Sequence, residues 1–218
     1  FTKMSDIDTE EKPILPDTIE DQNGLKEIRV NYLNVKNTLK NLNTKKASGP
    51  DGISGKMLKE TAEETAKTLT RIFNYSLATG TFPDSWKIAN VTPIHKKNDK
   101  QIVGNYRPIS LLSIVGKCLE RCVHNVVYKY LQDRNLLSKL QGAYTEMNST
   151  TTQLLEMYHT ILKNMDEGKE KRFLFLDFSK AFDRIWHAGL EHKLKRAGIG
   201  GQLLLWFQNY LHNRKQRV

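Results

Sequence analysis

The segment Arg172-Phe173-Leu174-Phe175-Leu176, which ends on Asp177, constrains the fold more than any other stretch of the sequence. A short and nearly continuous apolar run is typical of a strand buried on both faces, in the middle of a sheet. An acid directly after such a strand is held rigidly at the edge of the sheet. The run therefore predicts a mixed fold with a central strand and a carboxylate at its end.

Apolar residues at steps of three and four predict helices over much of the remaining chain. The expected helices cover about residues 28–42, 55–78, 114–133, 154–165, 180–197 and 202–212. Two further strands, over residues 88–94 and 106–112, are expected to form a hairpin with a long basic tip at residues 95–100. The predicted fold class is therefore α/β (α+β), helix-rich around a small sheet.

The charge of the chain is distributed unevenly. The 218 residues hold 34 Lys+Arg and 24 Asp+Glu, which gives a formal charge of +10. Residues 1–29 carry −4 and are interpreted as an acidic linker or N-terminal arm, whereas residues 30–218 carry +14. A basic body favours a polyanionic partner such as nucleic acid, and a merely basic soluble protein is the alternative.

Several classes of protein are excluded by composition. No stretch approaches the roughly 20 consecutive apolar residues of a membrane span. The two cysteines, Cys118 and Cys122, do not make a disulfide-rich secreted scaffold. The chain begins with Phe1 and shows no leader, so we expect a protein that is neither secreted nor embedded in a membrane.

Asp177 is the sharpest candidate for chemistry. Mg²⁺ takes oxygen ligands and usually only one or two protein carboxylates, so an acid at a strand end suits it. The alternative is an N-cap for the helix that follows. Asp183 is better explained as an acid in the first turns of that helix. Phosphatases that use a strand-end aspartate carry a second one two residues later, where this chain has Ser179, so a phosphohydrolase is disfavoured.

Four segments, in order, resemble the reverse transcriptases encoded by non-LTR (LINE-type) retrotransposons. Residues 176–183 (LDFSKAFD) resemble the first catalytic motif of that family, and residues 105–112 (NYRPISLL) its fingers motif. Residues 46–53 (KASGPDGI) are similar to a segment ahead of the fingers, and residues 209–218 (NYLHNRKQRV) to the segment after the first catalytic helix. One such motif is weak, but four in family order are specific.

The resemblance implies a partial reverse transcriptase domain over residues 30–218, with the fingers and the first part of the palm of a right-hand polymerase. It implies an RNA-directed DNA polymerase that adds dNTPs to a primer 3′-hydroxyl, with an RNA template and a DNA primer as partners. The chemistry would use two metal ions, Mg²⁺ or alternatively Mn²⁺. The family's setting implies the nucleus or the cytoplasm.

The resemblance also assigns roles to individual residues. Asp177 would bind the catalytic metal, beside the backbone carbonyl of Phe178. Arg107 would grip the incoming triphosphate together with Lys96, or with Lys97 if the loop alignment shifts by one residue. Phe182 matches the aromatic residue under the nucleotide sugar, although it also lies on one expected helix face with Trp186 and Leu190.

Other basic residues are candidate contacts to template or primer phosphates. They lie in the expected hairpin tip, at the end of the 180–197 helix and near residue 218: Lys97, Lys100, Lys195, Arg196, Arg214, Lys215 and Arg217. For each of them, an ordinary solvated surface is the alternative interpretation.

Two features count against activity of these residues alone. The family's aromatic-x-Asp-Asp motif is absent, and both ends look like cuts in a longer chain, so we expect residues 1–218 to be inactive as a polymerase. In the loop at residues 141–150, Thr145, Met147 and Asn148 replace the Arg and Gly common in the family. Met147 cannot take positive φ without strain. A non-catalytic nucleic-acid-binding remnant, or a decayed element copy, is therefore the alternative function.

Overall fold

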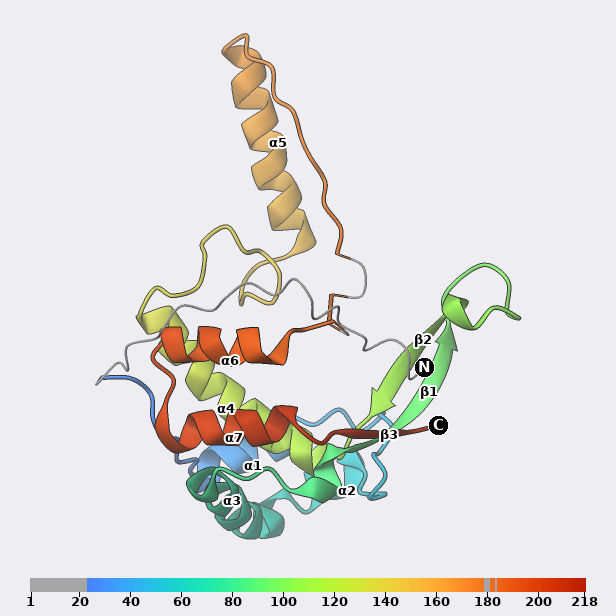
Figure 1. Cartoon of the computed structure of the whole chain (residues 1–218), viewed down its shortest axis with the longest axis vertical. Coiled ribbons are helices and arrows are strands. Elements are labelled where there is room, and N and C mark those ends of the chain that lie inside the picture. The colour runs from blue at the N-terminus through green and yellow to red at the C-terminus, as the bar shows by residue number, and fades with distance from the viewer. Residues whose placement is uncertain (1–22, 179–180, 183) are drawn as a thin grey trace.

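The computed structural model describes residues 23–178, 181–182 and 184–218 (Figure 1). Most of the expected acidic arm, together with Ser179, Lys180 and Asp183, lies outside the described residues. Within them the elements are α1 (Tyr32–Lys40), α2 (Gly55–Glu60), α3 (Ala62–Thr79), β1 (Ile88–His95), β2 (Tyr106–Leu111), α4 (Ile114–Asp133), α5 (Thr150–Asp166), α6 (His187–Arg196), α7 (Gly201–Leu211) and β3 (Lys215–Arg217). The expected helix-rich fold class with a small sheet is confirmed.

Helices α1, α3, α4 and α7 form the body of the molecule and bury a common apolar core. Its largest fully buried side chains include Leu39 of α1, Phe73 of α3, Leu119 of α4 and Trp206 of α7. The indole N–H of Trp206 donates to the Ser76 hydroxyl at 3.0 Å, so its polar atom is satisfied inside the core.

The strands form a three-stranded sheet in the order β2-β1-β3. β1 and β2 pair antiparallel, with Ile94 opposite Arg107 and His95 opposite Tyr106. This confirms the predicted hairpin, which extends away from the helical body (Figure 1). β3 pairs parallel to β1 on its other edge, with Ile88 opposite Lys215.

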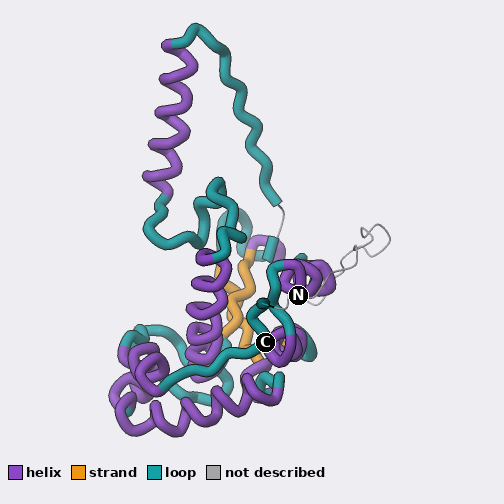
Figure 2. The backbone as a smooth tube through the Cα atoms, turned by 90° about the vertical axis from the view of Figure 1, so that its left-hand side faces the viewer, coloured by secondary structure: helices purple, strands orange, loops and turns teal. Residues whose placement is uncertain are grey.

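The predicted central strand at residues 172–176 is wrong. These residues form no strand, and Leu176 is 78% exposed. They return from the far end of α5 toward the body as an extended segment (Figures 1 and 2). A strand needs a neighbour to pair with its backbone, and none of the described residues supplies one here. The apolar run is therefore solvent-exposed in this structure.

Three helix predictions need correction. The helix expected at residues 55–78 divides at Thr61 into α2 and α3. The helix expected from residue 180 begins only at His187, where the N-cap Trp186 is extended. The spacing of Leu204, Phe207 and Leu211 predicts that these residues face inward, but the buried residues of α7 are Leu203 and Trp206, on the side that packs against α3.

The described part of the segment before residue 30 packs onto the body. The backbone N–H of Leu25 donates to the Gly198 carbonyl at 2.8 Å, and Ile28 is buried. The proposed domain boundary at residue 30 stays a prediction. Among the described residues, no helix has the length and apolar character needed to cross a membrane.

Candidate functional site

The tip of the β1–β2 hairpin carries two of the predicted phosphate-binding residues on one face. Arg107 lies opposite Ile94 in the ladder, and Lys96 continues that ladder because its backbone N–H donates to the Asn105 carbonyl at 2.8 Å. Side chains alternate along a strand, so Lys96 lies on the same face as Ile94 and Arg107. Diagonal neighbours of this kind lie roughly 7–8 Å apart. Both side chains are exposed.

The register bears on the choice between Lys96 and Lys97. Lys97 follows at a bend beyond the ladder, next to Asn98, whose φ is +65°. The hairpin tip is closed by its own contacts: the Tyr106 hydroxyl donates to the Lys100 carbonyl at 2.9 Å, and the rings of Tyr106 and His95 meet edge to face. The ladder thus brings Lys96, rather than Lys97, beside Arg107.

β3 adds two cations to the same face of the sheet. Lys215 lies opposite Ile88 and Arg217 opposite Asn90, and both partners share the face that bears Ile94. The Arg217 Nε–H donates to the Asn90 side-chain oxygen at 2.5 Å. One face of the sheet therefore carries four predicted binding residues, two at the hairpin tip and two near its base.

Arg214 is held against the body of the protein instead. Its guanidinium carbon lies 4.6 Å from the centre of the Tyr210 ring, and its Nη1 donates to the Tyr210 carbonyl at 2.9 Å. Burial, together with the neighbouring Glu120 carboxylate, raises the pKa of Tyr210 to about 12. Burial likewise raises the pKa of Glu120, against the opposing attraction of Arg214. These contacts give Arg214 a packing role at the end of α7.

Lys195 and Arg196 lie in the last turn of α6 and are exposed. Basic side chains at a helix C-terminus are favoured by the partial negative charge of the unpaired carbonyl groups. Their position is thus explained by the helix itself, and it leaves their side chains open to solvent.

Asp177 and Phe178 directly follow the exposed run at residues 172–176, and both are exposed. A carboxylate and a backbone carbonyl are oxygen ligands of the type that Mg²⁺ prefers. Among the described residues, however, no group of three or more His, Cys, Asp or Glu side chains gathers to hold a metal ion. The donor types therefore fit a magnesium ion, and they form a partial ligand set.

Phe182 contacts an aromatic residue that the sequence did not single out. Its ring meets that of Tyr144 edge to face, with 5.9 Å between the ring centres. Tyr144 belongs to the 141–150 loop, where Tyr144 and Met147 have φ of +61° and +63°. Such values are strained for residues with side chains, so Met147 does adopt the conformation expected to cost it energy.

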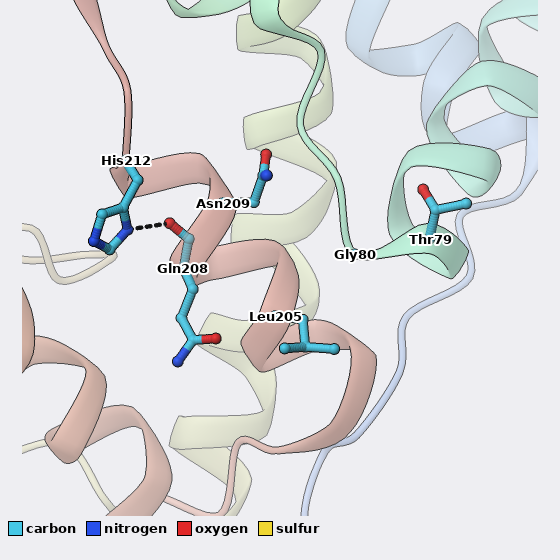
Figure 3. A pocket seen from close by; sticks show the side chains of 6 residues that line it. All are labelled: Thr79, Gly80, Leu205, Gln208, Asn209 and His212. Atoms are coloured by element: carbon cyan, nitrogen blue, oxygen red, sulfur yellow. Dashed lines mark hydrogen bonds between the residues drawn. The ribbon is translucent and has the colours of Figure 1, made fainter.

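A pocket of about 400 Å³ lies between the end of α3 and α7 (Figure 3). The described residues that line it are Thr79, Gly80, Leu205, Gln208, Asn209 and His212, all distinct from the predicted site residues. Two of these side chains are already engaged: His212 Nδ1–H donates to the Gln208 carbonyl, and the Asn209 oxygen accepts from the Phe82 N–H. The predicted chemistry lies elsewhere.

Comparison with known proteins decides the family. Residues 94–218 match the family described as reverse transcriptase (RNA-dependent DNA polymerase). The chain belongs to the reverse transcriptase family. It is 34% identical over 84% of its length to the RNA-directed DNA polymerase from mobile element jockey of Drosophila melanogaster, and 33% identical over 79% to the probable RNA-directed DNA polymerase from transposon BS of the same species.

A third relative comes from another kind of element. The chain is 28% identical over 83% of its length to the retrovirus-related Pol polyprotein from type-1 retrotransposable element R1 of Bradysia coprophila. These relatives confirm the resemblance to enzymes of non-LTR elements. The chain spans about a fifth of the length of each of them.

Two of the reverse transcriptase motifs that are far apart in the sequence lie in contact. The Ser113 hydroxyl, directly after the fingers motif, donates to the Asp51 carboxylate at 2.6 Å. Sequence reasoning missed Asp51 as a candidate, although its place in the Gly-Pro-Asp-Gly turn of the 46–53 motif was a signal. It also missed Tyr144, for which the sequence offered only an aromatic residue in a polar loop.

Proposed function

We propose that this chain supplies the fingers and the first part of the palm of an RNA-directed DNA polymerase of a non-LTR retrotransposon. The observation that carries the proposal is the shared face of Lys96 and Arg107 at the hairpin tip, in a chain of the reverse transcriptase family. The substrates would be dNTPs, with an RNA template and a DNA primer.

The paired cations suit the triphosphate of an incoming nucleotide. The guanidinium of Arg107 offers a planar fork of donors to phosphate oxygens, and the ammonium of Lys96 supplies a compact charge beside it. Because both are exposed on one face, they can contact the same triphosphate. Lys215 and Arg217 extend the positive face toward the base of the hairpin, where they would neutralise nucleic-acid phosphates.

Asp177 and the carbonyl of Phe178 would hold a divalent metal ion, Mg²⁺ or Mn²⁺. Of the two metal ions that such chemistry uses, one would lower the pKa of the primer hydroxyl and the other would offset charge on the leaving pyrophosphate. The chain's own contribution is to orient the substrate: Arg107 and Lys96 fix the phosphates, and Phe182, backed by Tyr144, would lie against the sugar.

Primer extension on an RNA template tests the role of Asp177 in the complete polymerase that contains this chain. Asp177→Ala should abolish extension, whereas Asp166→Ala, which removes an exposed carboxylate from the end of α5, should leave it unchanged. Equal activity in Asp177→Ala and the unaltered enzyme would refute the metal role. Retained template binding without any extension in the unaltered enzyme would favour a non-catalytic nucleic-acid-binding remnant.

The nucleotide site is tested separately through Arg107. Arg107→Ala should raise the KM for dNTPs by about tenfold or more while template affinity is kept, since one charge-assisted phosphate contact is lost. Arg71→Ala, an exposed arginine on α3, is the matched control. An unchanged KM in Arg107→Ala would remove Arg107 from the site.

A further inference from the structure

The joint between β2 and α4, residues 112 and 113, is a short connection. β2 ends at Leu111 and α4 begins at Ile114, so two residues separate the strand that carries Arg107 from the central helix of the core. The helix is fixed in the core through Leu119 and its neighbours, whereas the hairpin extends outward (Figure 1). The direction of the hairpin therefore depends on how these two residues are held.

Asp51 holds this joint through a chain of hydrogen bonds. Its Oδ2 accepts from the Ser113 hydroxyl at 2.6 Å, and that hydroxyl oxygen accepts from the Gly116 N–H at 3.3 Å. Ser113 is only 1% exposed. The other carboxylate oxygen of Asp51 accepts from the Ile53 N–H at 3.2 Å, which fixes the side chain in its own turn. The carboxylate also lies at the N-terminal end of α4, where the helix dipole favours negative charge.

The backbone at Gly49, two residues before Asp51, packs closely against Leu112 and Ser113. A Cβ at Gly49 would lie 2.5 Å from the carbonyl carbon of Leu112 and 2.5 Å from the Ser113 nitrogen. Only glycine permits so close an approach of two backbones. Nearby, a Cβ at Gly116 in the first turn of α4 would lie 3.2 Å from the side chain of Trp86, which precedes β1. Both strands of the hairpin are thus anchored at the first turn of α4.

A small tilt at the joint between β2 and α4 produces a larger displacement at the hairpin tip. Arg107 lies six residues before Ser113, and an extended strand rises about 3.3 Å per residue, so the lever is roughly 20 Å long. A tilt of about 5° would then move Arg107 by about 1.7 Å. A displacement of that size takes a donor out of hydrogen-bonding range, so the contact of Arg107 with a triphosphate would weaken.

We propose that Asp51 is a positioning residue: by bonding Ser113 it fixes the joint between β2 and α4, and so sets where Arg107 meets the triphosphate of a nucleotide. This inference rests on the proposed nucleotide role of Arg107. The Gly-Pro-Asp-Gly motif would then fix the orientation of the fingers hairpin, although it lies about 60 residues earlier in the chain.

The kinetic test uses the complete polymerase that contains this chain. Asp51→Ala should raise the KM for dNTPs about three- to tenfold, with kcat and template affinity little changed, because one hydrogen bond to the joint is lost. Ser113→Ala should produce the same shift, and the double variant should be no worse than either single one, since both break the same link. Asn43→Ala is the matched control, because its side chain accepts a similar turn bond from the Lys45 N–H within its own loop.

A second measurement follows the joint itself in the 218-residue chain, without any activity. Amide hydrogen exchange at Gly116 should accelerate in Asp51→Ala and to a smaller degree in the isosteric Asp51→Asn, which keeps an oxygen for the Ile53 N–H. Should Asp51→Ala fold poorly, Asp51→Asn carries the kinetic test. Unchanged exchange at Gly116 in both variants would overturn the proposal.

The outcomes separate this proposal from the one on which it rests. If Arg107→Ala raises the KM and Asp51→Ala does not, the positioning role alone is wrong. If Arg107→Ala has no effect on the KM, the nucleotide role of Arg107 fails and the positioning role falls with it. If kcat, template affinity and melting temperature all fall together in Asp51→Ala, Asp51 has only a structural role.

Discussion

Helices α4 and α5 share an amphipathic sequence pattern, but one lies in the core and the other is exposed to solvent. Both are long and amphipathic, and each begins after a serine whose hydroxyl accepts a backbone N–H of the first turn. α4 buries eight residues in the core, whereas none of the residues of α5 is buried. Leu119 of α4 is fully buried, but Leu155 of α5 is 61% exposed.

The difference shows what a helical pattern can and cannot specify. Spacing and capping determine that a helix forms and where it starts. Whether its apolar face is buried depends on a partner surface, which α1 and the rest of the common core provide for α4. α5 and the extended segment after it stand apart from the body, and their apolar side chains remain in solvent (Figure 2). A helix without tertiary packing is only marginally stable in water.

The largest expected effect is in hydrogen exchange. Amides in the interior of α4 should exchange only through global unfolding, while those of α5 should exchange through local opening, so we expect rates to differ by a factor on the order of 10³ or more. Exchange followed by mass spectrometry or NMR on the 218-residue chain measures this directly. Similar protection in the two helices would contradict the exposed position of α5.

Truncation of matched leucines sharpens the same comparison. Leu119→Ala should lower the free energy of unfolding by about 2–5 kcal/mol, because it leaves a cavity in the packed core. Leu155→Ala removes the same atoms from an exposed position and should change it by less than about 0.5 kcal/mol. Urea unfolding of both variants provides the values. A large loss in Leu155→Ala would mean that α5 packs against the body in solution.

Removal of a helix cap should also act differently in the two regions. Asn31 caps α1 by accepting from the Asn34 N–H at 2.8 Å, so Asn31→Ala should lower global stability by about 1 kcal/mol. Ser149 caps α5 through the Thr152 N–H at 3.1 Å. Ser149→Ala should speed exchange within α5 and leave the midpoint of urea unfolding in place. A shifted midpoint in Ser149→Ala would show that the arm and the body unfold together.

The smallest expected effect is on the pH dependence of stability, and it arises from α3 in the helical body. A hydrogen bond from Lys36, aided by Lys40 and Tyr32, lowers the pKa of Glu63 from its ordinary value of 4.5 to about 2. A carboxyl with a lowered folded-state pKa stabilises the fold above pH 4.5, and that contribution is lost as pH falls toward 2. Glu63→Gln should therefore flatten the acid side of the stability profile slightly. Glu64→Gln, on the same turn of α3, should keep the original slope.

The sequence predicted elements well where local chemistry decides them. The hairpin followed from two strand-like runs around a basic tip, and α4 followed from apolar residues at steps of three and four. The strand at residues 172–176 failed because apolar character does not say which neighbour completes a sheet. The choice between Lys96 and Lys97 needed the ladder register, which a loop of uncertain length cannot supply.

Contacts between distant segments were beyond the sequence for the same reason. Asp51 and Ser113 are 62 residues apart, and Tyr144 and Phe182, whose rings meet, are 38 residues apart. Neither pair has a local spacing that would reveal it. The candidate residues were found by resemblance, whereas the contacts made by Asp51 and Tyr144 were visible only in three dimensions.

The parallel pairing of β3 with β1 has a consequence for how the chain is made. The hydrogen bond from Arg217 to Asn90 joins residues that are 127 positions apart in the sequence. By contrast, β1 and β2 are consecutive strands, and they can pair within microseconds once both have been synthesised. At roughly 5–20 residues per second, a ribosome needs about 6–25 s to bring β3 out after β1. During that interval the edge of β1 that later pairs with β3 has unpaired backbone groups, and another exposed strand can pair with it. A chaperone that covers this edge would protect the nascent chain from such mispairing.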